Sequence, residues 1–377
     1  MTADPVGSTW NASWITCILQ VDRLGTGNLL THVEQNVKEE NVKMERIKKL
    51  LAIVMCVAML LCCAACGAKE ETPAAKEETK TETPAEETPA EETPTADEKI
   101  VIAGTLQDMS NEFMVMLKDA MDATLPEYDN VELNILDGEG SPDKQVSQIE
   151  NFIAQEVDAI ILCPQDGTAL VPAVKQALEA GIPVITVSAD IDQQVGQVNV
   201  GSNHKDAGIM QAEWAAEQLG GKGKIVYLRG PIGHFAEVQR AEGTLEVFEK
   251  YPDIEIVFDQ TGNWDRDQGM SLMENALQGQ PEIDMVMSQN DEMVLGAITA
   301  LEGAGKNDAI ISIGMDAIPD ALKAIEEGRL DATIFQDAFG QGSGALRVAI
   351  KAAQGEAVET VVIPWAVVDA SNVADYK

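Results

Sequence analysis

Short apolar segments alternate with amphipathic segments from Lys99 almost to the end of the chain, and this alternation constrains the fold more than any other feature. The apolar segments have the length and β-branched content of strands, and those between them have helical periodicity. Continuous apolar strands that alternate with helices form parallel sheets covered by helices on both faces. The predicted strands are Ile100–Ala103, Val131–Leu136, Ala159–Cys163, Val184–Val187, Ile225–Leu228, Ile254–Phe258, Met285–Met287, Ile310–Ile313 and Ala332–Phe335. The predicted helices include Phe113–Leu125, Val146–Gln155, Ala169–Ala180, Ala207–Leu219 and Met293–Ala304.

This pattern divides into two halves of similar build, before and after about Ser202. Gly181, Gly220 and Gly305 stand where helices should end, a position that favours glycine. The sequence therefore predicts an α/β fold of two doubly wound parallel-sheet lobes.

Polar or aromatic residues follow most of the predicted strands, in an otherwise apolar context. In open parallel sheets the ligand crevice lies at the carboxyl ends of the strands. These positions are therefore where we expect function: Asn111, Phe113, Ser188–Asp190, Arg240, Trp264, Asn290, Asp316 and Gln336.

A segment typical of an export signal precedes the ordered part. It has a basic stretch, an apolar run from Leu50 to Leu61, too short to span a bilayer, and Leu61-Cys62-Cys63-Ala64-Ala65-Cys66. A cysteine directly after Ala-Ala resembles a bacterial lipoprotein signal, so we expect residues 44–66 to be a signal ending at an acylated Cys66. A plain secretory signal and a membrane anchor are the alternatives, and each places the protein outside the cytoplasm.

The segments on either side of this signal are not expected to fold. Residues 67–98 consist almost wholly of Glu, Thr, Pro, Ala and Lys, so they cannot bury enough apolar surface and are interpreted as a disordered acidic tether. Residues 1–43 would place a soluble segment before a signal, and we interpret them as a mis-called start or a disordered segment.

The composition excludes several classes of partner and cofactor. The net charge is -37, which disfavours nucleic acid and anionic headgroups. Only Cys66 and Cys163 among the six cysteines belong to the mature chain, so no internal disulfide is expected if Cys66 carries lipid. His204 and His234 lack partners at metal-ligand spacing, and we expect neither a metal nor another cofactor.

The segment Ser288-Gln289-Asn290-Asp291-Glu292-Met293-Val294-Leu295-Gly296-Ala297 resembles the ribose/galactose-type periplasmic binding proteins, the solute receptors of sugar ABC transporters. The resemblance extends over nearly all of residues 99–368. It includes Asn111-Glu112-Phe113, Gly181-Ile182-Pro183, Arg240-Ala241-Glu242-Gly243, Trp264-Asp265-Arg266 and Gly314-Met315-Asp316. It implies a hinge of three crossovers near 202, 336 and 364. The first lobe would comprise residues 99–202 plus 337–364, and the second 203–336 plus 365–377.

The resemblance also implies a set of ligand-binding residues. Carboxylate, amide and guanidinium groups suit vicinal hydroxyls, and an indole face suits sugar C–H groups. The expected ligand residues are Asn111, Phe113, Met114, Asp190, Arg240, Trp264, Asn290, Asp316 and Gln336. Ser188 and Ala189 stand where ribose-type members have an Asp-Arg pair, and Met114 where a second aromatic is usual. These departures favour a pentose other than ribose, a hexose or a polyol.

Each of these residues has a simpler interpretation as well. Asn290 and Asp316 could be helix caps, Trp264 could be ordinary packing, and Asp190 a surface-loop residue. Arg240 could instead pair with Glu237 or Glu242 on a solvated face. Close helix packing accounts for Gly340-Gln341-Gly342-Ser343-Gly344 better than a phosphate-binding loop does.

The expected function is a lipid-anchored, monomeric receptor that binds a sugar or polyol and delivers it to an ABC permease, on a Gram-positive cell surface. No catalytic motif is recognisable, so we expect no enzyme. The alternatives are a sensory receptor of the same fold for a sugar or furanose-like signal, a transcription regulator of the lactose-repressor type and, more distantly, a surface enzyme.

Overall fold

The structure is a computed structural model that describes residues 99–376. The predicted signal, Cys66, the tether and residues 1–43 lie outside the described residues. Between residues 99 and 376, no helix is long and apolar enough to cross a membrane.

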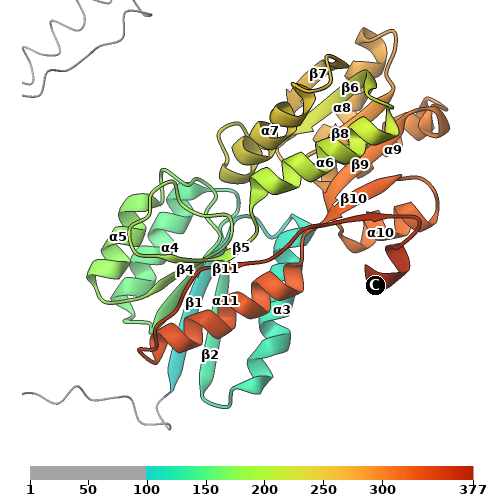
Figure 1. The fold of residues 1–377 in the computed structure, drawn as a ribbon. Coiled ribbons are helices and arrows are strands. Elements are labelled where there is room, and N and C mark those ends of the chain that lie inside the picture. The colour runs from blue at the N-terminus through green and yellow to red at the C-terminus, as the bar shows by residue number, and fades with distance from the viewer. Residues whose placement is uncertain (1–98, 377) are drawn as a thin grey trace, which may run out of the picture. The chain divides into compact units, whose positions relative to one another are not determined.

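The first sheet has six parallel strands in the order β11-β5-β4-β3-β1-β2. Its strands are β1 (Ile100–Leu106), β2 (Val131–Asp137), β3 (Ala159–Leu162), β4 (Val184–Ser188), β5 (Val198–Gly201) and β11 (Val361–Val362). On one face α3 (Glu112–Thr124) packs against α11 (Ala338–Ala353), and α4 (Pro142–Ala154) and α5 (Val171–Glu179) lie on the other (Figure 1). A short 3-10 turn, η2 (Leu125–Glu127), follows α3.

The second sheet has the order β12-β10-β9-β8-β6-β7, in which only β12 runs antiparallel to its neighbour. Its strands are β6 (Lys222–Arg229), β7 (Asp253–Thr261), β8 (Met285–Ser288), β9 (Ile311–Asp316), β10 (Ala332–Phe335) and β12 (Ala366–Asp369). Its helices are α6 (His204–Gln218), packed on α7 (Phe235–Phe248), α8 (Arg266–Gly279), packed on α9 (Asp291–Gly303), and α10 (Pro319–Glu326). The 3-10 turns η3 (Asn307–Ala309) and η4 (Val373–Tyr376) complete this part.

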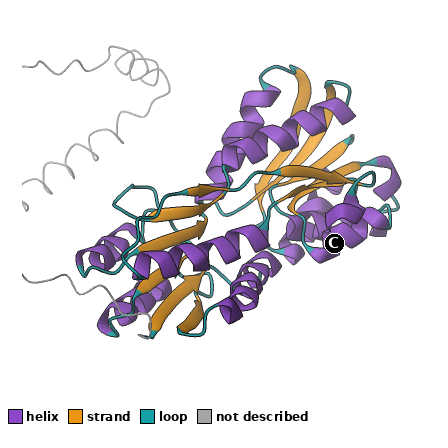
Figure 2. Ribbon diagram, turned by 60° about the horizontal axis from the view of Figure 1, so that its bottom comes forward, coloured by secondary structure: helices purple, strands orange, loops and turns teal. Residues whose placement is uncertain are grey.

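The chain passes between the two sheets three times. The first crossover, residues 202–203, joins β5 to α6, and the second, residues 336–337, joins β10 to α11. The third, residues 363–365, joins β11 to β12. Figure 2 shows each sheet with helices on both of its faces. The prediction of two parallel-sheet α/β lobes is confirmed.

Burial explains why the strands could be recognised. The central strands β3, β4 and β8 are buried along their whole length, so they read as continuous apolar runs, whereas the edge strand β2 is only partly buried. The strands β5, β11 and β12 were not predicted, because they are short and only partly buried or exposed, whereas the equally short β3 and β8 are buried throughout. Gly181, Gly220 and Gly305 have φ of 83°, 63° and 65°, which confirms that they end helices in the left-handed region.

Candidate ligand-binding site

Two adjoining cavities lie where the carboxyl ends of strands from both sheets meet. The inner cavity has about 40 Å³ and the outer about 470 Å³, and Gln107, Asn111, Met114 and Trp264 line both. The inner cavity has room for only one or two waters, whereas the outer has the volume of a small-molecule site. A ligand that reaches the inner residues therefore requires the lobes to separate.

The inner cavity brings together most of the residues that the sequence predicts as ligand contacts. The residues that line it are Gln107, Asn111, Phe113, Met114, Ser188, Ala189, His204, His234, Ala236, Arg240, Trp264, Asn290, Asp316 and Gln336. Eight of the nine predicted ligand residues belong to this set, and Asp190 does not. Polar groups and aromatic faces from both lobes thus converge on one small volume.

Asp190 is directed into its own loop. Its carboxylate accepts hydrogen bonds from Thr186 Oγ1 at 2.9 Å, from the backbone N of Ile191 at 2.8 Å, and from the side chains of Gln194 and Gln197 at 2.9 and 3.1 Å. These bonds order the segment between β4 and β5. The structure does not bring Asp190 to the cleft.

Two of the lining asparagines also begin helices. Asn111 Oδ1 accepts from the backbone N of Phe113 at 3.0 Å, and Asn290 Oδ1 accepts from Met293 N at 3.0 Å. Asn290 Nδ2 donates to the backbone oxygen of Trp264 at 3.1 Å. The interpretation of Asn290 as a helix cap is confirmed, and it coexists with a place in the cavity wall. Asp316 is not a cap, because α10 has Ile318 at that position.

Strained backbone is concentrated in the cavity wall. Ser188, Trp264 and Asp316 have φ of 62°, 64° and 123°, values that residues with a Cβ rarely adopt. Such conformations cost about 1–3 kcal/mol each and persist only where the surrounding structure imposes them. Here they turn the last residues of β4 and β9 and the loop after β7 toward the cavity.

Arg240 is the buried cation of the inner cavity, with only 4% of its surface exposed. Its guanidinium donates to Gln289 O, to Gln336 Oε1 at 2.8 Å and to His204 Nδ1 at 3.3 Å. The alternative pairing with Glu237 or Glu242 is wrong, because Glu237 pairs with Arg229 and Glu242 with Lys205. Burial lowers the pKa of Arg240, an effect that Asp316 opposes.

Asp316 is the carboxylate nearest to this cation. Its Oδ1 lies 4.0 Å from Nη2 of Arg240, farther than a hydrogen bond, and its side chain is 7% exposed. Burial raises the pKa of Asp316 well above its usual value, although Arg240 acts in the opposite direction. The carboxyl group is therefore poised to gain stability from hydroxyl donors that a ligand brings.

Two histidines in the cavity wall were not predicted as site residues. His204 opens α6, and its Nε2 donates to Ser188 O at 3.0 Å while Nδ1 accepts from Arg240, which fixes the neutral tautomer. Burial is the main cause and the charge of Arg240 the second cause of a lowered pKa in both histidines. The pKa of His204 falls well below its usual value, and that of His234 falls to about 4. The strand-end rule would have found both, had β5 been recognised and had the start of α7 been placed at residue 235.

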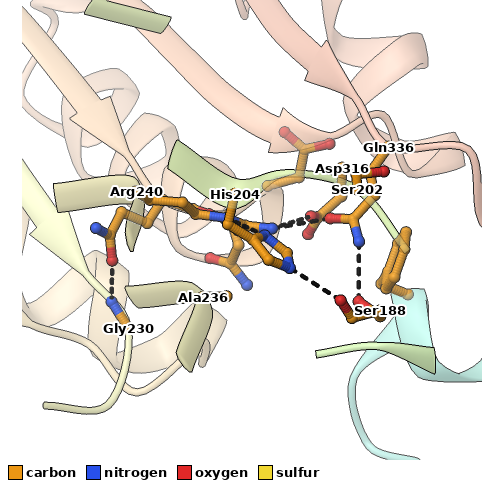
Figure 3. Close-up of polar contacts among 12 residues, drawn as sticks. Ser188, Ser202, His204, Gly230, Ala236, Arg240, Asp316 and Gln336 are labelled. Carbon is orange, nitrogen blue, oxygen red and sulfur yellow. Dashed lines mark hydrogen bonds and ion pairs between the residues drawn. The ribbon is translucent and has the colours of Figure 1, made fainter. Parts of the chain in front are cut away.

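Ser188 and Gln336 close a ring of polar contacts in this wall (Figure 3). Gln336 Nε2 donates to Ser188 Oγ at 2.9 Å, and Gln336 Oε1 accepts from Arg240, which in turn meets His204 and through it Ser188. Ser188 therefore fixes the second crossover through its hydrogen bond with Gln336. This accounts for a small hydroxyl residue at a position where the resemblance leads us to expect an acid.

The described residues offer no metal centre and no reactive thiol. Between residues 99 and 376 no group of His, Cys, Asp and Glu could hold a metal ion. Cys163 is buried, and this burial raises its pKa to about 12, so the thiol is inert. The glycine-rich stretch around Gly342 lies against α3, where a Cβ on Gly342 would come 2.3 Å from Leu117 O, which confirms close helix packing.

Comparison with known proteins gives matches over about two thirds to three quarters of the chain. The model of the periplasmic binding protein domain matches residues 102–357. A putative rhizopine-binding protein of Rhizobium meliloti is 39% identical over 291 residues, covering 75% of this chain and 94% of the relative. A xylitol-binding protein of Mycolicibacterium smegmatis is 38% identical, covering 69% and 74% respectively. An ABC transporter solute-binding protein from Bacillus halodurans with bound myo-inositol is 40% identical with a TM-score of 0.72, covering 74% and 98%.

Proposed function

Since this chain belongs to the periplasmic binding protein family, we propose that it captures a polyol or sugar outside the cytoplasm and delivers it to an ABC permease. One observation carries this proposal. Amide, carboxyl and guanidinium groups converge with Phe113 and Trp264 in a wall that both lobes contribute. Such a wall matches a ring that has polar edges and apolar faces. No step of this function requires a chemical reaction.

Myo-inositol and xylitol are the first ligands to test. The solute-binding protein with bound myo-inositol is 40% identical to this chain, and the xylitol-binding protein is 38% identical. Both are neutral, and each presents hydroxyl groups that could donate to Asp316 and accept from Arg240 and Asn290. A site built in this way rejects an analogue that lacks one of those hydroxyls, because its own buried polar groups would lose their partners.

Lobe closure is the proposed mechanical step. A ligand that contacts both lobes binds the closed arrangement better than the open one, and it therefore shifts the population toward closure. The three crossovers would act as the hinge, with 99–202 plus 337–364 as one lobe and 203–336 plus 365–377 as the other. An anchor on Cys66 and the acidic tether would hold the receptor, as a monomer, near its permease on a Gram-positive surface.

Thermal unfolding of the full chain with myo-inositol, xylitol, D-ribose and a furanose sugar tests the ligand class. A ligand at 100 times its dissociation constant adds about 2.7 kcal/mol of stability, which gives a rise in Tm of several degrees. We expect this shift with a polyol and a much smaller one in Asp316→Asn at the same ligand concentration. A folded protein with no shift for any compound would refute the proposed ligand class. Uptake of the ligand into vesicles that contain the permease then distinguishes transport from a sensory role.

A further inference from the structure

The guanidinium of Arg240 lies over two indole rings. Its Cζ atom is 5.6 Å from the ring centre of Trp264 and 5.6 Å from that of Trp365. Trp264 lines both cavities, whereas Trp365 lines neither and belongs to the third crossover. A desolvated cation over an aromatic face is held more strongly than one on a solvated surface.

Arg240 also meets the other two crossovers. It donates to Gln336, the first residue of the second crossover, and to His204, the residue that directly follows the first. One ligand-site cation therefore contacts the chain at, or next to, each of its three passages between the sheets. Figure 3 shows the contacts to His204 and Gln336.

Trp365 is fixed by contacts beyond Arg240. Its Nε1 donates to the backbone oxygen of Asn203 at 2.7 Å, which joins the third crossover to the first. Its ring packs edge-on against His204, with 5.6 Å between ring centres, and only 9% of the residue is exposed. Neither Trp365 nor His204 can move without disturbing Arg240.

From these contacts we infer that Trp365 is a positioning residue, and that the Arg240–Trp365–His204 cluster transmits ligand occupancy to all three crossovers. The inference deepens the proposed function and rests on it for the identity of the ligand. Three of the five guanidinium N–H groups have partners in the ligand-free chain, which leaves donors for a ligand. A ligand that accepts hydrogen bonds from those donors therefore binds the same guanidinium that contacts all three crossovers.

The test measures lobe separation and ligand binding in the same full-chain variants. Pulsed-EPR distances are recorded between labels on encoded azide side chains at the exposed positions Glu179 in α5 and Glu255 in β7. Trp365→Leu removes the ring and its hydrogen bond, and Trp365→Phe keeps a ring. Trp214→Leu is the matched control, because Trp214 packs in the same apolar cluster as Trp365 but lines neither cavity.

We expect Trp365→Leu to broaden the ligand-free distance distribution and to weaken myo-inositol binding about tenfold, with Trp365→Phe intermediate and Trp214→Leu unchanged in both. A ligand-free distribution that matches the wild type in Trp365→Leu would overturn the inference, whatever the affinity. If the wild type instead fails to bind myo-inositol while Trp365→Leu still changes the ligand-free distance distribution, that result would support the coupling and refute myo-inositol as the ligand.

Discussion

Nε2 of Gln107 lies 2.8 Å from Nε2 of His234, and this contact crosses the cleft. Gln107 directly follows β1 of the first sheet, and His234 directly precedes α7 of the second. The amide of Gln107 also donates to the backbone oxygen of Pro164 at 2.8 Å. The two lobes are therefore joined by a direct hydrogen bond next to the place where we expect the ligand.

Acid should weaken this contact through His234. Burial and then Arg240 lower its pKa to about 4, against a smaller opposing effect of Asp166. The ring nitrogens of His234 face two N–H groups, Gln107 Nε2 and Ala236 N; the neutral ring can accept a hydrogen bond from one of them, and the protonated ring from neither. An unfolded histidine titrates near 6.5, so this stability is present above pH 6.5 and is lost as the pH falls toward 4. Relative to His234→Gln, the wild type should lose about 3 kcal/mol between pH 7 and pH 4 in urea unfolding.

The comparison with His234→Gln is needed because buried carboxyl groups act in the opposite direction. The pKa of Asp316 is raised well above its usual value and that of Asp291 to about 7, in both cases mainly by burial. Their contribution to stability is present at low pH and is lost as the pH rises through these raised values. Asp316, Asp291 and His204 are present in both the wild type and His234→Gln, so their effects on stability cancel in the comparison. Parallel stability curves for the two proteins would contradict the role given to His234.

Asp316→Asn separates binding from folding. The side chain keeps its shape but loses its charge, and no hydrogen bond of the native carboxylate with another side chain is lost, since Arg240 lies 4.0 Å away. Ligand affinity should fall roughly 30-fold or more, the cost of removing one partner of a buried charged contact. Stability without ligand should stay equal or rise, because the raised pKa shows that the ionised form is costly here. Calorimetric titration that finds native affinity would exclude Asp316 from the site.

Asn290 serves both the cavity wall and a helix, so its variants must be compared in pairs. Asn290→Ala removes the bond to Met293 N and should lower the free energy of unfolding by about 1 kcal/mol in addition to weakening binding. Asn290→Ser keeps an uncharged oxygen for that cap but loses the donor to Trp264 O. Weak binding in both variants, with the larger loss of stability in Asn290→Ala, is the expected result. Equal losses of stability would show that the cap is not the cause.

The sequence predicted the lobes and most of the cavity wall for one physical reason. Buried parallel strands read as apolar runs, and their carboxyl ends converge, so the sequence alone predicts that Asn290 and Asp316 lie close together. The same logic misplaced Asp190. That residue is the second after β4, but whether a side chain turns into the cleft or back into its loop depends on partners such as Gln194 and Gln197. Hydrogen bonds within a loop leave no periodic signal.

The histidines and Trp365 show a second limit of the sequence. Contacts between Arg240 and Trp365 or His204 join residues that lie far apart in the chain, and no local pattern records them. The sequence likewise does not predict that Ser188 accepts a hydrogen bond from Gln336, 148 positions away. Such pairings arise from the packing of three crossovers, which becomes visible only once both sheets are in place.

Gly208 in α6 should be intolerant of any side chain. A Cβ there would lie 2.0 Å from the backbone oxygen of Arg240, so Gly208→Ala must push α6 away from α7 and displace that arginine. We expect a loss of about 1–3 kcal/mol in unfolding free energy and weaker ligand binding. Gly303→Ala, at the open end of α9 where no atom lies within 4 Å, should instead stabilise the protein by about 0.5–1 kcal/mol. Opposite signs for these two variants in urea unfolding would support the close approach of α6 and α7.

Acylation of Cys66 predicts where the protein is found in a cell. Cys66→Ser removes the thiol that a diacylglycerol would occupy, while the basic stretch and the apolar run of the signal stay intact. The receptor should then move from the membrane fraction to the medium of a Gram-positive host, because the acidic tether and a net charge of -37 give it no other affinity for anionic lipid. Metabolic labelling with a palmitate analogue should mark the wild type alone. Equal membrane retention of the wild type and Cys66→Ser would favour the membrane anchor over the lipoprotein.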